Sequence, residues 1–221
     1  MRLSLRHLTA ASAFAALLAT VGVAHAGDVT ATVKEDTSGA APKGLDLKLV
    51  TGNDLAVKVE RVIRWTDAAG DNVAVFATTG KEGVKDGERY ESKSLHVGTF
   101  LDKGGKLTRV QKIIESVQPC PLDLYAAFIP GASGVGDADG DGVGELTIAY
   151  QTACVGDISP RSMKVLVLQK DKKWALRGEA AVDIGDGEII GGDFKADFRK
   201  APPALLEHAK RVWAKHKRQT Y

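Results

Sequence analysis

The residues best suited to chemistry lie between positions 137 and 145, in the stretch DADGDGVGE. Aspartates occupy the alternate positions 137, 139 and 141, Gly142 follows them, and Glu145 completes the stretch. Alternate side chains of a tightly coiled loop converge on one centre, and the glycine permits the sharp bend that such a loop needs. Carboxylate oxygens in this number suit a hard cation, so the spacing predicts a metal site. Two alternatives to a calcium site stay open, namely an Asp-Gly turn that binds nothing and a site for another metal.

The loop departs from the calcium site of helix-loop-helix proteins. In that site, position 12 of the loop supplies a bidentate glutamate, whereas the corresponding residue here is Ile148, within an apolar run. The pattern D-x-D-x-D-G-x-x-[DE] instead resembles the calcium loops of FG-GAP and related β-propeller repeats, in which the loop joins two strands. The resemblance implies Ca²⁺ as the cofactor. The ligands that it implies are Asp137, Asp139, Asp141, Glu145 and the backbone carbonyl of Val143, with Glu145 where the family more often has aspartate.

A wider resemblance covers roughly residues 95 to 180. The chain has, in order, the pair Cys120-Pro121, the acidic loop, a strand pattern containing Tyr150 and Cys154, GDISP at 156–160, Lys164 and LRG at 176–178. This order is similar to that of a family of exported bacterial proteins labelled as surface polysaccharide biosynthesis proteins. The label implies no known reaction, so the resemblance names no enzyme.

Residues 1–26 are typical of a signal peptide. Arg2 and Arg6 precede an apolar run from residue 10 to residue 23, and Ala24-His25-Ala26 is the small-x-small pattern of a cleavage site. The alternative is a retained N-terminal anchor, for which the run is short. We expect a mature chain from Gly27, periplasmic or secreted, with no transmembrane segment.

The two cysteines, Cys120 and Cys154, both lie in the mature chain. In an oxidising compartment an isolated pair favours a disulfide, which here would enclose the acidic loop. The alternative is a redox or metal pair, although the chain has no CxxC motif.

Seven runs rich in Val, Ile, Leu and aromatic residues are predicted as strands, namely residues 55–65, 72–79, 94–101, 106–117, 145–155, 163–169 and 173–182. The connections DKGGK and QKDKK are typical of hairpin turns. The sequence therefore predicts a mainly β fold, an antiparallel meander of hairpins forming a sandwich or partial propeller-like sheets. We expect residues 27–44 to be an exposed lead-in, a further strand near 46–50, and a single β-rich domain over 45–221.

A C-terminal amphipathic helix is predicted over residues 202–218. Pro202 and Pro203 suit its first turn, and the apolar residues fall three and four positions apart, at Leu205, Leu206, Ala209, Val212 and Trp213. The helix could cap the sheet with its basic face in solvent, or it could bind a membrane surface or an anionic partner.

Charge and motifs restrict the function. The leader holds two of the 30 Lys and Arg residues, so 28 basic residues balance 28 acidic residues in the mature chain. Basic residues gather in the last segment rather than over the fold, and nucleic acid is not expected as a partner of an exported chain. Our first hypothesis is a non-catalytic calcium-binding protein that binds or scaffolds an envelope glycan or protein. The alternative is an envelope hydrolase that uses paired carboxylates such as Asp157 and Glu179, with calcium ordering a loop beside its site.

Overall fold

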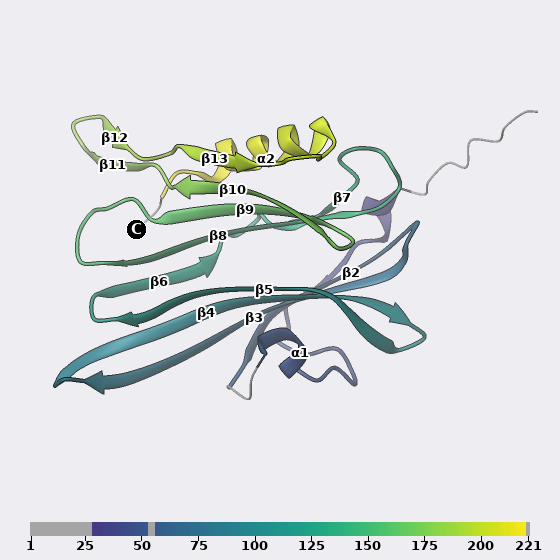
Figure 1. The fold of residues 1–221 in the computed structure, drawn as a ribbon, viewed down its shortest axis with the longest axis horizontal. Coiled ribbons are helices and arrows are strands. Elements are labelled where there is room, and N and C mark those ends of the chain that lie inside the picture. Colours follow the sequence, from purple (N-terminus) through teal and green to yellow (C-terminus); the bar gives the residue numbers. More distant parts are fainter. Residues whose placement is uncertain (1–27, 53–55, 220–221) are drawn as a thin grey trace, which may run out of the picture.

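The computed structural model describes residues 28–52 and 56–219, so the predicted signal peptide lies outside the described residues. In this part of the chain two antiparallel sheets pack face to face (Figure 1). Helix α1 (Lys48–Thr51) covers the outer face of the first sheet, and helix α2 (Pro203–His216) covers that of the second. The prediction of a mainly β, antiparallel fold with one C-terminal helix is confirmed.

The first sheet is a meander whose strands follow chain order. They are β1 (Lys34–Asp36), β2 (Lys58–Asp67), β3 (Gly70–Lys85), β4 (Glu88–Lys103) and β5 (Lys106–Cys120). The β4–β5 turn contains Gly104 and Gly105, both at positive φ (63° and 90°), a conformation that glycine adopts readily. Strands β3 and β4 extend beyond the predicted runs because they continue to pair with each other as far as Lys85 and Glu88.

The second sheet has the order β13-β10-β9-β8-β6, and a short strand β7 also pairs with β8. The bounds are β6 (Asp123–Phe128), β7 (Gly134–Gly136), β8 (Glu145–Val155), β9 (Ser162–Gln169), β10 (Lys172–Glu179) and β13 (Phe194–Asp197). A separate hairpin joins β11 (Val182–Gly185) and β12 (Glu188–Ile190). The central strand β8 is buried on both faces, with Leu146, Ile148 and Tyr150 in the main core and Ala149 on the side of α2.

The main core lies between the two sheets. Alternate residues of the central strands point into it, and its largest members include Trp65, Phe76, Leu146, Ile148 and Leu168. The opposite face of β9 and β10 packs against α2, through Val165, Val167, Leu176 and Trp213 among others. Each sheet therefore buries apolar side chains on both faces, which is the pattern expected of central strands that are covered from both sides.

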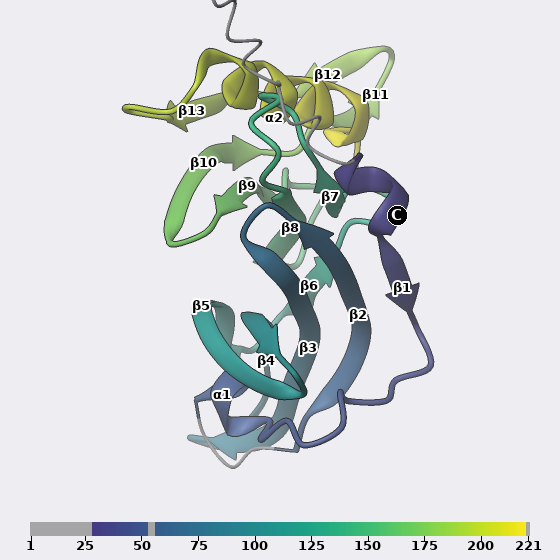
Figure 2. The same ribbon diagram turned by 90° about the vertical axis from the view of Figure 1, so that its right-hand side faces the viewer.

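The N-terminal segment contributes ordered structure to the first sheet. Residues 28–44 are mostly exposed, but they contain a 3₁₀ helix, η1 (Val29–Thr32), and β1, which lies at the edge beside β2 (Figure 2). The Val29 side chain is buried in the main core. The prediction of a strand near 46–50 was wrong, since α1 occupies this region. Val50 is fully buried there against the outer face of the first sheet, and a short apolar run cannot distinguish one helical turn from a strand.

Helix α2 is held against the second sheet by its apolar stripe. Leu205, Ala209 and Trp213 are at most 1% exposed, and the hydroxyl of Thr147 in β8 is 2.8 Å from Nε2 of His208. The helix is therefore packed as a cap, within two residues of its predicted start and end. Among the described residues, no helix has both the length and the apolar character required to cross a bilayer.

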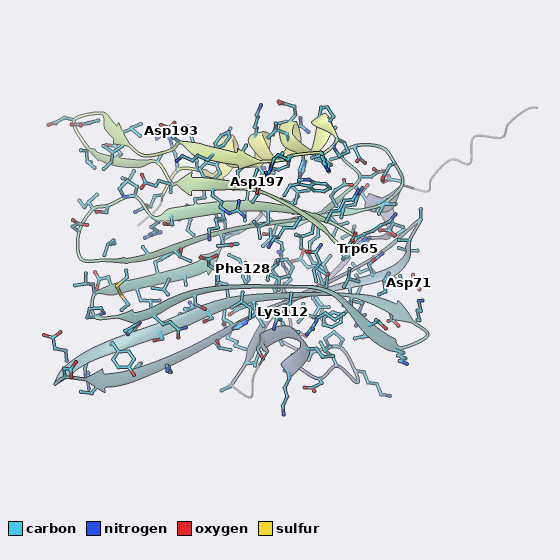
Figure 3. The ribbon with its side chains drawn as sticks, viewed as in Figure 1. Trp65, Asp71, Lys112, Phe128, Asp193 and Asp197 are labelled. Carbon is cyan, nitrogen blue, oxygen red and sulfur yellow. A yellow bond between two sulfur atoms is a disulfide. The ribbon has the colours of Figure 1, made fainter. Side chains whose placement is uncertain are left out.

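A disulfide joins the two sheets. Cys120 ends β5 in the first sheet and Cys154 lies in β8 of the second, with their Cα atoms 5.6 Å apart (Figure 3). The predicted pairing is therefore present. It encloses β6, β7 and the acidic loop, and it fixes one end of the inter-sheet core.

Removing this bond should cost substantial stability. In a Cys120→Ala/Cys154→Ala double variant we expect the free energy of unfolding to fall by about 3–4 kcal/mol, since the bond closes a loop of 34 residues in the unfolded chain. Urea unfolding of the oxidised wild type and of the double variant would measure the difference. Reduced wild-type protein is the matched control and should behave as the double variant does. A loss below about 1 kcal/mol would contradict the expectation.

Candidate metal site

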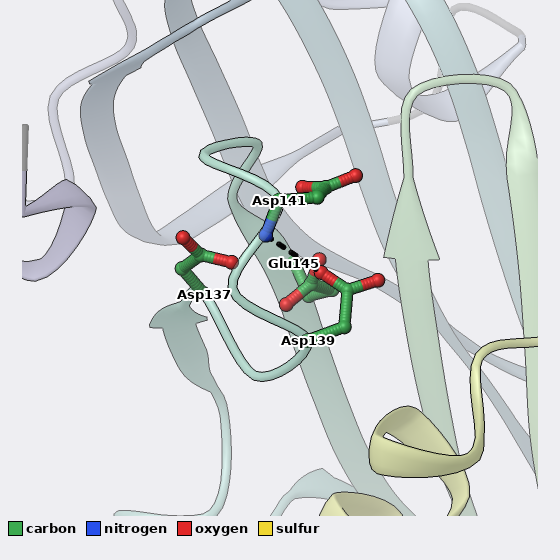
Figure 4. Close-up of side chains that lie close together, drawn as sticks. All are labelled: Asp137, Asp139, Asp141 and Glu145. Carbon is green, nitrogen blue, oxygen red and sulfur yellow. Dashed lines mark hydrogen bonds between the residues drawn. The ribbon is translucent and has the colours of Figure 1, made fainter. Parts of the chain in front are cut away.

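The acidic loop is the turn of the β7–β8 hairpin. Gly136 at the end of β7 pairs with Glu145 at the start of β8, so the intervening residues 137–144 coil over a narrow base. Asp137, Asp139, Asp141 and Glu145 each offer a carboxylate oxygen to one centre, and these atoms lie within 4.8 Å of one another (Figure 4). The structure thus brings together all four acids that the sequence indicated.

Backbone N–H groups hold the aspartates in place. The two carboxylate oxygens of Asp137 accept hydrogen bonds from the N–H groups of Gly140 (2.8 Å) and Gly142 (3.0 Å). Asp141 accepts from the N–H of Val143 at 2.8 Å, and Asp139 accepts from that of Asp141 at 3.3 Å. The loop is therefore preorganised by its own backbone, with Gly140 and Gly142 at positive φ (76° and 79°).

Glu145 is the buried member of the cluster. Its side chain is 1% exposed, and Oε2 accepts a hydrogen bond from the N–H of Ala138 at 2.7 Å. Burial raises the pKa of Glu145 to about 7, and the negative charges of Asp139 and Asp137 act in the same direction. Burial, followed by the charge of Asp141, also raises the pKa of Asp139. The cluster therefore favours any positive charge placed at its centre.

No side chain supplies that charge within residues 28–52 and 56–219. The ion pairs there involve other acids, and none of the four clustered carboxylates is paired with a Lys, Arg or His. An oxygen-rich cluster without a basic partner matches the ligand preference of a hard divalent cation. The geometry thus defines a partly buried acidic cluster that could hold a metal ion.

Gln169 also belongs to the site, and no motif in the sequence indicates it. It is the last residue of β9 and is 8% exposed. Its Nε2 donates to Oε1 of Glu145 at 2.8 Å and to Oδ2 of Asp141 at 3.1 Å. An amide in this position orients two carboxylates from outside the loop, as residues around a metal site commonly do.

The β2–β3 turn supports the loop from the first sheet. Asp67 Oδ2 accepts hydrogen bonds from the N–H of Gly144 (3.0 Å) and from Nε1 of Trp65 (2.9 Å), and the N–H of Ala68 donates to the Gly142 carbonyl (2.9 Å). A Cβ atom on Gly144 would lie only 2.8 Å from Nε1 of Trp65. The loop thus packs directly on the main core, and a glycine is required where the indole covers it.

The remaining sequence candidates lie elsewhere or have other contacts. Val143 is 6% exposed, and its N–H is the donor to Asp141. Asp157 accepts a hydrogen bond from the Ser159 hydroxyl within an exposed turn. Glu179 is exposed near the end of β10, and its N–H donates to the Asp193 carbonyl. In the part of the chain that the structure describes, no hydrogen bond joins Asp157 to Glu179.

The fold and the site define a class of protein. It is a two-sheet antiparallel β-protein with an inter-sheet disulfide and an acidic hairpin loop able to receive a cation. The chain matches no family model, no curated protein and no solved structure.

Proposed function

We propose that the protein is an extracytoplasmic calcium-binding β-protein with a non-catalytic binding or scaffolding role at the cell envelope. The bound ion would be held by Asp137, Asp139, Asp141, Glu145 and the backbone carbonyl of Val143. The observation that carries the proposal is the convergence of four carboxylates within 4.8 Å, one of them buried, with no basic side chain among them. Four carboxylates and a carbonyl supply five hard oxygen ligands, and a bidentate carboxylate or water would complete the six to eight that Ca²⁺ takes.

The position of the loop favours a supporting role for the ion. The loop closes the β7–β8 hairpin, contacts the β2–β3 turn through Asp67 and contacts β9 through Gln169. A cation at its centre would therefore connect elements of both sheets. Calcium rather than magnesium fits this proposal, because magnesium demands a small octahedral shell and retains several of its waters.

The envelope location rests on two features. The Cys120–Cys154 disulfide is typical of proteins that fold in an oxidising compartment, and the first 26 residues have the pattern of a leader. The similarity to exported proteins labelled for surface polysaccharide biosynthesis agrees with this location and rests on the sequence motifs alone. It suggests an envelope glycan or protein as the partner.

Calcium titration of chelator-treated protein tests the proposal directly. We expect one calcium per chain by calorimetry and elemental analysis, and weaker binding of magnesium. Asp139→Asn keeps an oxygen but removes one charge, so it should weaken calcium binding by about tenfold or more while the fold persists.

Asp183→Ala is the matched control for this titration. Asp183 accepts a hydrogen bond from the N–H two residues later, at 3.0 Å, as Asp141 does, but it lies in the β11–β12 hairpin away from the cluster. The calcium affinity of the Asp183→Ala protein should equal that of the wild type. Absence of calcium from the purified protein together with no heat of binding would reduce the loop to a turn.

A further inference from the structure

A cavity of about 290 Å³ opens where the ends of the two sheets meet the acidic loop. Four segments surround it, namely the β2–β3 turn, the β9–β10 turn, the acidic loop and the part of the β4–β5 hairpin near its turn. Trp65, which is labelled at this end of the molecule in Figure 3, lines one wall. The volume is close to the lower end of the range for small-molecule sites in proteins.

The inner wall of the cavity is apolar. Trp65, Val143, Leu146 and Leu168 line it, and each is at most 6% exposed. The polar groups near this wall already have partners, since Asp67 accepts from Trp65 and Gly144, and Thr99 Oγ1 accepts from the N–H of Gln111. Water would find few hydrogen-bond partners here, so an apolar group is the better occupant of the inner part.

The rim of the cavity is polar. It is formed by Asn72 near the start of β3 and by Lys170 and Asp171 of the β9–β10 turn, and both Lys170 and Asp171 are exposed. Because one cation and one anion lie side by side, the rim offers hydrogen bonds without a strong preference for either charge. An apolar body with one hydrogen-bonding group would satisfy both the wall and the rim.

The size of the cavity restricts the occupant further. An α-helix with its side chains is roughly 10–12 Å across, which is too wide for a space of this volume. We therefore propose that the cavity binds one small amphipathic molecule, with an apolar body of one or two rings and a single hydroxyl or amide group that lies at the rim. This site is additional to the proposed cation site, although Val143 and Gly144 of the acidic loop form part of its wall.

Naphthol has this chemistry and is fluorescent, so it serves as the probe. We expect its fluorescence to change saturably on titration with the full mature protein, at one probe per chain. Val110→Phe should weaken this binding by about tenfold or more. Val110 lines the cavity, is half-buried, and lies at the irregularity of the β4–β5 register, so a larger side chain can enter the cavity there without displacing a paired residue.

Two further variants make the test decisive. Ile114→Phe adds a ring to the same strand but on an exposed position outside the cavity, so its affinity should equal that of the wild type. Leu101→Phe fills the cavity from β4. It is used in place of Val110→Phe if urea unfolding shows that the Val110→Phe protein is not folded. Non-saturable binding, or equal affinity in a folded cavity-filling variant and in Ile114→Phe, would overturn the proposal. Naphthol titrations with and without calcium distinguish the cavity from the cation site. Naphthol can fail to bind while calcium still binds, and calcium can fail to bind while naphthol still binds.

Discussion

Removal of calcium should lower the free energy of unfolding of the wild-type protein by about 4 kcal/mol. The reference state is the same protein at a free calcium concentration about 1,000 times the dissociation constant for calcium. The ion would bind the folded loop and not the unfolded chain, so its binding free energy adds to stability. The loop contacts β9 and the β2–β3 turn, so loss of the ion would also weaken the contacts that the loop makes with these two elements. Thermal or urea unfolding with and without EDTA measures the effect, and added calcium should reverse it more fully than magnesium.

The calcium response should depend on the cluster and on nothing else. Asp141→Ala removes one carboxylate and the hydrogen bonds to Val143 and Gln169, so this variant should unfold at the same point with EDTA as with calcium. Asp183→Ala loses an equivalent turn hydrogen bond and should keep the full response. An identical unfolding curve for the wild type in both buffers, with no calcium in the purified protein, would remove the assignment of the loop as a cation site.

The acidic cluster could be predicted because its members are close neighbours in sequence. Alternation within one coiled loop brings Asp137, Asp139 and Asp141 together whatever the rest of the fold does. The supporting residues depend instead on distant pairing. Gln169 reaches Glu145 only because β9 lies beside β8 in one particular register, and Asp67 reaches Gly144 from the other sheet. A one-residue slip of β9 would turn Gln169 to the other face of the sheet. The pattern of a single strand does not show which strand lies beside it.

The fold shows the same division between local and distant information. Long alternating runs such as residues 145–155 were identified as strands with the observed limits. Strand β6 is absent from the predicted strands because its run between Pro121 and Pro130 is short. Strands β3 and β4 continue through polar residues because they pair with each other there. Such pairing leaves no hydrophobic pattern in the sequence. Helix α1 is only four residues long, so its apolar residues show no period that separates a helix from a strand.

Trp213→Ala should destabilise the protein by about 3–5 kcal/mol, as truncation of a buried large aromatic does. The indole is 1% exposed between α2 and the second sheet, its ring centroid is 5.1 Å from that of Phe194, and its Nε1 donates to the Gly192 carbonyl at 3.0 Å. The substitution leaves a cavity and an unpaired carbonyl at once. Trp213→Phe keeps much of the ring volume and loses the hydrogen bond, so its loss of stability should be smaller.

Lys210→Ala is the matched control on the solvent side of the same helix. Lys210 pairs with Glu207 at 2.7 Å, three residues away, and its side chain is 42% exposed, so its loss should change the free energy of unfolding by less than about 0.5 kcal/mol. Urea unfolding of the three variants would rank Trp213→Ala first, Trp213→Phe second and Lys210→Ala last. A Trp213→Ala protein as stable as the wild type would mean that α2 does not pack on β9 and β10 in solution. The apolar stripe of the helix would then be available to a membrane surface or a partner, which is the alternative that its basic residues suggested.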